Sequence, residues 1–299
     1  METPPKTIIS ASRRTDIPAF HGDWFMERIA AGGTTCINPF NGAEYTVSLR
    51  REDVALFVFW SKDFAPFLPH LETLDRLGYK FYFHYTINGY PAWLEPGVPP
   101  LERHIETARR LAERFGPERL LWRFDPIVFS SETPPEYVFG NFARIAAALE
   151  GASSRCYTSF AQLYGKVRRR FAEVNEERGT VFHMGEEFRK KNERPGGCIE
   201  FDLSERERRD FAARMATAAA ARGISLFACC QDYLQMPFGS PPILKASCID
   251  FELAARICGE YPAGAANPTR KQCGCHLSRD IGAYDTCRHA CAYCYAAGG

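Results

Sequence analysis

The chain has 299 residues, and 45% of them are hydrophobic, so it can bury a substantial core. Its formal net charge of +1 gives no global electrostatic case for binding nucleic acid, a membrane surface or an acidic partner. No apolar run is long enough to span a bilayer, and the N-terminus lacks the pattern of a secretory signal, so we expect a cytoplasmic protein.

Short apolar runs alternate with helix-like segments along most of the chain. The predicted strands are, in chain order, Thr7–Ser12, Thr34–Ile37, Val54–Trp60, Tyr79–Thr86, Leu120–Val128, Cys156–Leu163 and Ile224–Cys230. A helix is predicted from Leu101 to Phe115. Capping boxes, formed by Thr133 with Glu136 and by Ser204 with Glu207, predict two more helix starts.

This alternation of strand and helix implies parallel pairing, in which each crossover helix covers one face of a sheet. The expected fold is therefore α/β, a complete or partial TIM-type β/α barrel over residues 1–228. Residues 229–299 are cysteine-rich, and we expect them to pack on the barrel and close its mouth.

Most predicted strands are apolar and become polar at their carboxyl ends, where a β/α barrel carries its active site. Within Leu120–Val128, period-two alternation places Arg123 and Asp125 on one face. The alternative is that these polar residues are helix caps or buried ion pairs. The candidate binding residues selected in this way are Arg13, Arg14, Asp16, Lys62, Arg123 and Asp125.

The chain has 12 cysteines, and without an export signal they indicate metal binding rather than disulfides. Cys287, Cys291 and Cys294 have the spacing C-x3-C-x2-C. Three thiolates can hold three irons of a [4Fe-4S] cluster and leave the fourth iron open for chemistry. The alternative is a structural zinc, which usually takes four closed ligands.

A second group of cysteines lies upstream. Cys273 and Cys275 form a C-x-C pair, and Cys248 with Cys230 would complete four thiolates. Cys229 is an alternative to Cys230, which lies nearer the predicted strand mouth. The second site then holds a closed [4Fe-4S] cluster or a structural zinc.

Several segments resemble an uncharacterised, radical-SAM-like family of bacteria and archaea, where SAM is S-adenosylmethionine. The segments are Ser12–Pro18, Phe59–Lys62, Trp122–Ile127 and the C-terminal block from Asp280 to Cys294 with its three cysteines. Part of this pattern is also distantly similar to spore photoproduct lyases. In radical SAM enzymes the open iron binds SAM, and one electron cleaves a carbon–sulfur bond of SAM to give a deoxyadenosyl radical.

The resemblance implies an oxygen-sensitive enzyme that receives electrons from a small donor such as ferredoxin or flavodoxin. It also implies that Tyr293, which precedes the last cysteine, packs against adenine. Two features depart from the usual radical SAM pattern: the cysteine motif lies at the C-terminal end of the chain, and no clear Gly-Gly-Glu segment is present to hold the SAM amino group.

The polar strand ends are expected to replace that segment. Arg13, Arg14 or Lys62 would meet the SAM carboxylate, and Asp16 or Asp125 its amino group or ribose hydroxyls.

His84, Tyr85 and Tyr295 are candidates for hydrogen-atom transfer, although each can equally be a packing residue. The basic run at residues 166–170 fits a solvated helix face or a contact with nucleic-acid phosphates. The substrate is not identified by the sequence. Two other functions stay open: a β/α-barrel hydrolase or lyase with structural zinc, and an iron–sulfur electron carrier.

Overall fold

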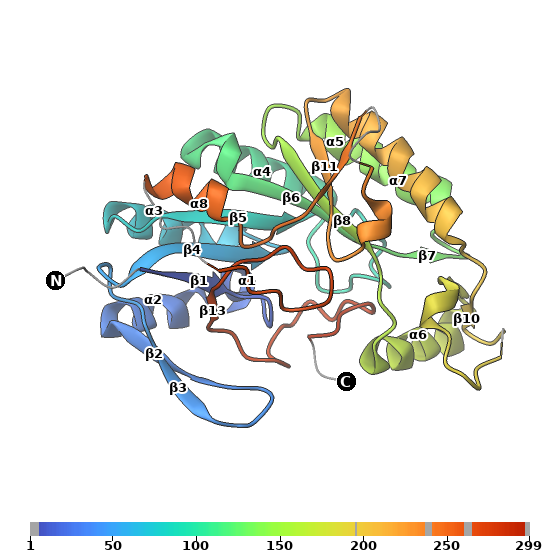
Figure 1. Ribbon diagram of the computed structural model, residues 1–299, viewed down its shortest axis with the longest axis horizontal. Helices are drawn as coiled ribbons and strands as arrows, with labels where there is room; N and C mark the ends of the chain where they lie inside the picture. The colour runs from blue at the N-terminus through green and yellow to red at the C-terminus, as the bar shows by residue number, and fades with distance from the viewer. Residues whose placement is uncertain (1–5, 195, 237–240, 260–264, 297–299) are drawn as a thin grey trace.

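A computed structural model describes residues 6–194, 196–236, 241–259 and 265–296, which form a mixed α/β fold (Figure 1). The strands are β1 (Thr7–Ala11), β2 (Gly33–Ile37), β3 (Glu44–Ser48), β4 (Val54–Ser61), β5 (Phe81–Thr86), β6 (Leu120–Ile127), β7 (Phe129–Ser130), β8 (Arg155–Phe160), β9 (Phe182–His183), β10 (Ile199–Glu200), β11 (Ser225–Ala228), β12 (Ile243–Lys245) and β13 (Arg279–Asp280). The α-helices are α1 (Ile17–Phe20), α2 (Gly22–Ala31), α3 (Leu68–Arg76), α4 (Leu101–Phe115), α5 (Pro135–Ala148), α6 (Gly165–Arg178), α7 (Glu205–Ala220) and α8 (Phe251–Cys258). Short 3-10 helices cover Ala65–Phe67, Pro117–Arg119, Glu186–Phe188 and Asp232–Leu234.

Among the described residues, the main sheet has eight parallel strands in the order β12-β11-β8-β6-β5-β4-β1-β13. The six strands from β1 to β11 in this order are the six predicted for the scaffold. They follow one another in the sheet as in the chain, which is the connectivity of a β/α barrel. In the described ranges no pairing joins β12 to β13, and a closed barrel stays a prediction.

The segment predicted as a strand at residues 34–37 lies outside this sheet. It belongs to β2, which pairs antiparallel with β3 in a hairpin that projects from the body of the molecule (Figure 1). A third, small sheet has the order β10-β9-β7.

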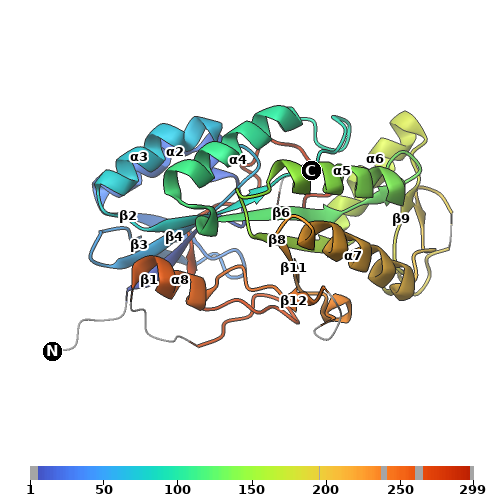
Figure 2. The same cartoon turned by 90° about the horizontal axis from the view of Figure 1, so that it is seen from above.

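The two faces of the main sheet are covered differently. Helices α2, α3 and α4 lie on one face, whereas α8 lies on the other (Figure 2). Because successive strand residues point to opposite faces, Phe81 and Phe83 pack under the helices. Tyr82, between them, packs in a second core with Leu253 of α8 and several of the cysteines. The segment after residue 228 therefore fills the face that the crossover helices leave open.

Two of the predicted helix signals are confirmed. Helix α4 has the predicted bounds, and at the start of α7 both hydrogen bonds of the Ser204–Glu207 capping box are present. The capping box predicted at Thr133 is wrong. Helix α5 begins at Pro135 without a side-chain cap, because the Thr133 hydroxyl instead donates to the carbonyl of Val128.

Asp280 attaches the C-terminal segment to the first strand. Strand β13 pairs with β1, and the buried carboxylate of Asp280 accepts hydrogen bonds from the hydroxyls of Ser10 (2.5 Å) and Ser12 (2.8 Å) and from the backbone N–H of Arg13 (2.9 Å). It also accepts from the N–H of Gly282 (3.0 Å). The chain that carries the last three cysteines is thereby held at the carboxyl end of β1.

No helix in the described part of the chain has the length and apolar character that a bilayer span requires.

We expect Asp280→Ala to lower the free energy of unfolding by about 3 kcal/mol, because it leaves two hydroxyls and two backbone donors without their charged acceptor. Glu150→Ala is the control: its exposed carboxylate pairs with Arg222, and its removal is expected to cost no more than about 1 kcal/mol. Denaturant titration of both variants measures the difference, and equal losses would contradict the anchoring role.

Candidate metal centres

The three C-terminal cysteines line one cavity of about 150 Å³ at the carboxyl ends of β1, β4 and β5. Cys291 is buried, whereas Cys287 and Cys294 are partly exposed. Predicted site residues share this cavity. They are Arg13, Asp16, Lys62, Tyr293 and Tyr295.

The surroundings of these thiols suit thiolate ligands. The sulfur of Cys287 accepts hydrogen bonds from the backbone of His289 and Asp16, and the sulfur of Cys294 accepts from the N–H of Ala296 (3.4 Å). Burial raises the pKa of the Cys287 thiol to about 11 and that of Cys291 above its usual range. A metal ion supplies the positive charge that such buried sulfurs need in order to lose their protons.

His289 lies between two of the cysteines in the sequence and is a conceivable fourth ligand. Its Nε2 bonds to the Asp16 carboxylate (2.8 Å), and its Nδ1 bonds to the carbonyl oxygen of Gly97 (2.8 Å). Both ring nitrogens are therefore engaged in hydrogen bonds, and neither is free to bind a metal. His289 is therefore a bridge between loops, and it leaves the three cysteines without an imidazole ligand.

Asp16 also has a structural role. One of its oxygens caps α1 through the N–H of Ala19 (2.9 Å), and the other accepts from the backbone N–H of Lys62 (2.7 Å) as well as from His289. It is 5% exposed, so it holds the ends of β1 and β4 together. Its predicted contact with SAM would need these bonds to be shared.

A buried network that the sequence did not reveal surrounds Lys62. Its ammonium donates to Glu95 (2.7 Å), which also accepts from the Tyr293 hydroxyl and from Asn88 (3.0 Å). Burial alone would lower the pKa of Lys62, but the charge and hydrogen bond of Glu95, together with the nearby sulfurs of Cys291 and Cys294, raise it. Glu95 lies in a segment, residues 95–100, that the sequence indicates only as a turn-rich connection.

The side chains of Arg13 and Arg14, which follow β1, point into different cavities. Arg13 lines the cavity of the three cysteines, and its guanidinium lies 3.7 Å from Asp280 and 5.8 Å from the centroid of Trp60. Arg14 instead lines a separate, mainly apolar cavity with Trp24. Of this pair, only Arg13 faces the cysteines.

The second group of cysteines contains five thiols. These are Cys229, Cys230, Cys248, Cys273 and Cys275, so the structure places both Cys229 and Cys230 there. All five line a cavity of about 230 Å³, which is also lined by Arg13, Tyr293, Cys294 and Tyr295. The two cysteine cavities are therefore adjacent, because Arg13, Tyr293, Cys294 and Tyr295 line both of them.

Arg123 and Asp125 lie on one face of β6, as predicted, and line the cavity of the second group. The Arg123 guanidinium donates to the sulfur of Cys248 (3.2 Å) and to Asp125, which also accepts from the Ser159 hydroxyl. Arg270 approaches the sulfur of Cys229 (3.9 Å) from the opposite segment. Two guanidinium groups thus face the second group of thiols.

The predicted hydrogen-transfer residues lie in three different places. Tyr85 points to the helix side of the sheet, where its hydroxyl meets His104 Nδ1 (3.0 Å), so it reaches neither cysteine cavity. His84 is fully buried on the inner face, bonds to the carbonyl of Cys248 (2.8 Å), and burial lowers its pKa to about 4. Tyr295 lines both cavities, and its hydroxyl donates to the carbonyl of Arg13 (3.2 Å).

The basic run of α6 makes contacts inside the protein. Arg170 donates to the carbonyls of Cys294 (2.9 Å) and Cys291 (3.4 Å), so it holds the loop of the three cysteines. Lys166 pairs with Asp285 (2.6 Å), and Arg168 pairs with Glu193. These contacts favour an intramolecular role over the alternative of phosphate binding.

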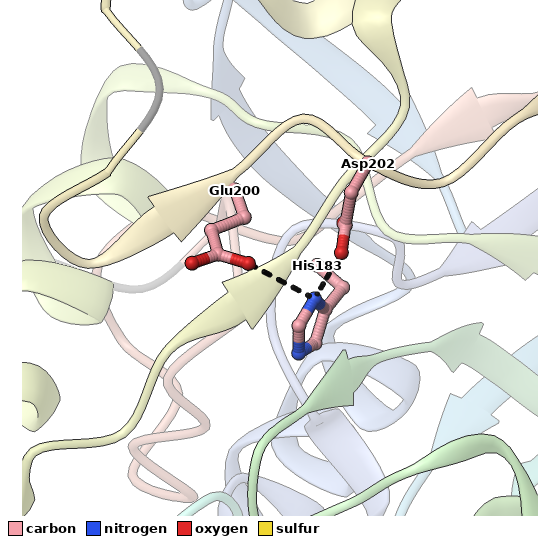
Figure 3. Close-up of side chains that lie close together, drawn as sticks. All are labelled: His183, Glu200 and Asp202. Carbon is pink, nitrogen blue, oxygen red and sulfur yellow. Dashed lines mark hydrogen bonds and ion pairs between the residues drawn. The ribbon is translucent and has the colours of Figure 1, made fainter.

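The spacing of the sulfurs bears on the choice of metal. A tetrahedral zinc with Zn–S bonds of about 2.3 Å holds its sulfurs about 3.8 Å apart. In the described ranges, the set of His, Cys, Asp and Glu ligand atoms that all lie within 4.8 Å of one another is His183, Glu200 and Asp202, on and beside the small sheet (Figure 3). Neither cysteine group offers three sulfurs that close together.

The fold and the site define an α/β protein whose parallel sheet carries two groups of cysteines around two adjacent cavities. A family model described as a domain of unknown function, DUF1848, matches residues 8–296, and the chain belongs to this family. No curated protein and no solved structure matches the chain.

We expect Lys62→Met to destabilise the protein by about 3–5 kcal/mol, because it leaves the Glu95 carboxylate buried without its cation. The double variant with Glu95→Gln should recover much of that loss, since no unpaired charge then remains. Denaturant unfolding of the single and double variants measures this coupling. Additive losses would show that the two groups do not form a pair.

We expect Arg170→Met to weaken metal retention at the three C-terminal cysteines by roughly tenfold or more, since it removes two hydrogen bonds worth about 1 kcal/mol each from their loop. Arg169→Met is the matched control, because the neighbouring Arg169 is exposed. Metal content after timed exposure to a chelator distinguishes the variants. Equal retention in both would contradict the role of Arg170.

Proposed function

We propose that this protein is a radical SAM enzyme in which Cys287, Cys291 and Cys294 hold a [4Fe-4S] cluster with one open iron. The observation that carries this proposal is that three cysteines line one cavity at the carboxyl ends of parallel strands. The nearby His289 uses both ring nitrogens in hydrogen bonds to Gly97 and Asp16 and adds no fourth ligand. The resemblance of the C-terminal motif and of three strand-end segments to radical-SAM-like proteins agrees with it.

The donor set fits an iron–sulfur cluster better than a zinc ion. The sulfurs are spread more widely than the edges of one tetrahedral ion allow, whereas a polynuclear cluster takes thiolates that are further apart. Backbone N–H groups directed at Cys287 and Cys294 are the kind of contact that tunes such clusters. At the upstream cysteines neighbouring sulfurs lie 3.8 and 3.9 Å apart, so a second cluster and a zinc both stay open there.

When bound, the cluster and SAM supply reductive cleavage of SAM, the start of radical chemistry on the substrate. The chain supplies the binding groups. Arg13 lies where the two cysteine cavities meet, and its guanidinium fits a carboxylate in a bidentate way. Tyr293, fixed by Glu95 and Asn88 through its hydroxyl, presents a rigid ring beside the ligands.

The strand ends of a partial β/α barrel would form the mouth of the site, and the cysteine-rich segment would cover it. Lys62 lines the cavity of the three cysteines, and its partner Glu95 is buried behind it. Electrons would come from a small donor such as ferredoxin or flavodoxin, as expected of an oxygen-sensitive cytoplasmic enzyme of this class.

The test is anaerobic purification with counts of iron, sulfide and zinc, followed by incubation with SAM and dithionite. We expect about eight irons per chain and release of 5′-deoxyadenosine. Cys291→Ala should abolish that release, whereas Cys258→Ala should retain it, because Cys258 lies on α8 and contacts the backbone of Ala55. Zinc in place of iron, or undiminished release from Cys291→Ala, would overturn the proposal.

A further inference from the structure

The second group of cysteines has one thiol more than a closed metal centre needs. A saturated cluster or a tetrahedral ion takes four thiolates, yet five lie together here. Their contacts form a ring. In order around it, the thiols are Cys229, Cys230, Cys273, Cys275 and Cys248, and Cys248 contacts Cys229 again.

The surplus arises from two adjacent residues at the end of β11. In extended backbone, neighbouring side chains point to opposite faces of the sheet, so Cys229 and Cys230 would normally separate. Cys230 instead has a φ of 55°, in the left-handed region, which costs a non-glycine residue roughly 1–2 kcal/mol. The result is that the two sulfurs lie 3.9 Å apart at the same site.

Each member of this pair has its own neighbour in the ring. The sulfur of Cys229 lies 3.8 Å from that of Cys248, and the thiol of Cys230 shares a hydrogen bond with Cys273. Either one, taken with Cys248, Cys273 and Cys275, therefore completes an unbroken arc of four sulfurs. The contacts favour neither as the fourth ligand.

Both members also line the cavity that Cys294 of the C-terminal group lines. Arg270 lies 3.9 Å from the sulfur of Cys229 and can pair with a thiolate there. A thiol released from the metal would thus face the space in which the substrate of the proposed enzyme would bind.

We propose that Cys229 and Cys230 share one ligand position of the second metal centre and exchange there, so that one of them is always free toward the cavity. In the exchange, one metal–sulfur bond forms as the other breaks, and the incoming thiol passes its proton to the outgoing thiolate. No electron is transferred. The inference depends on the proposed function only in requiring that the upstream cysteines bind a metal.

The experiment compares metal content in anaerobically prepared full-length Cys229→Ala, Cys230→Ala and the double variant. Each single variant should keep the full metal count, and the double variant should lose the second centre, a loss of about four irons or one zinc. Cys248→Ala should lose the same amount, and Cys258→Ala none. Loss in one single variant would identify a dedicated ligand and overturn the proposal, as would retention in the double variant.

Alkylation of the metal-loaded protein with iodoacetamide gives a second readout. Mass spectrometry should find one label on the Cys229–Cys230 pair in each chain, divided between the two residues, whereas none or two labels on this pair would overturn the exchange. Labels on the partly exposed thiols Cys198 and Cys258 are counted separately. The iron that the double variant retains, about four per chain, shows that its fold and first centre survive. If the unmodified protein releases no 5′-deoxyadenosine, the proposed function fails, but the metal counts still decide the exchange.

Discussion

The carboxylate of Asp280 makes the interaction on which the site depends. It joins the last part of the chain to the first strand through hydroxyls of Ser10 and Ser12 and the backbone of Arg13. Most radical SAM proteins carry the cysteine loop after their first barrel strand. Here the loop follows β13, which lies parallel to β1 and in register with it. The two arrangements bring the cysteines to the same edge of the sheet, so the C-terminal position of the motif is compatible with the proposed function.

The fold was largely predictable because its signals are local. Six apolar runs with polar ends became six neighbouring parallel strands, and the alternation in β6 placed Arg123 and Asp125 together. One helix signal was misleading because two hydrogen bonds were possible for the same hydroxyl. Thr133 has the position of a helix cap, but its hydroxyl donates to the carbonyl of Val128 in the turn before α5. Residues 34–37 have strand character, yet the sequence does not say which sheet they join.

Within the site, cysteine spacing identified the metal ligands as candidates but not the residues that hold them. Glu95 contacts Tyr293, about 200 positions away in the sequence, and Arg170 contacts Cys294, about 120 positions away. A single sequence contains no pattern that predicts such long-range contacts. His84 and Tyr85 are neighbours in β5, so their side chains point to opposite faces of the sheet. His84 lies on the inner face and Tyr85 under the helices, and the sequence alone did not show which of the two faces the cysteines. Cys230 was preferred to Cys229 because it lies nearer the predicted strand mouth, but the left-handed backbone at Cys230 brings both sulfurs to the same site.

The distribution of charge around the cavity of the second cysteine group gives an independent reason to expect anionic centres there. A chain with a net charge of +1 places Arg13, Arg123 and Arg270 around this space. Arg123 is 7% exposed, and its carboxylate partner Asp125 is shared with Ser159. A buried guanidinium is costly without compensation, and besides Asp125 that of Arg123 donates to the sulfur of Cys248. Under the proposed function, metal-bound thiolates would accept this hydrogen bond more strongly than neutral thiols. In the same proposal Arg13, at the junction of the two cavities, is the cation best placed to meet SAM.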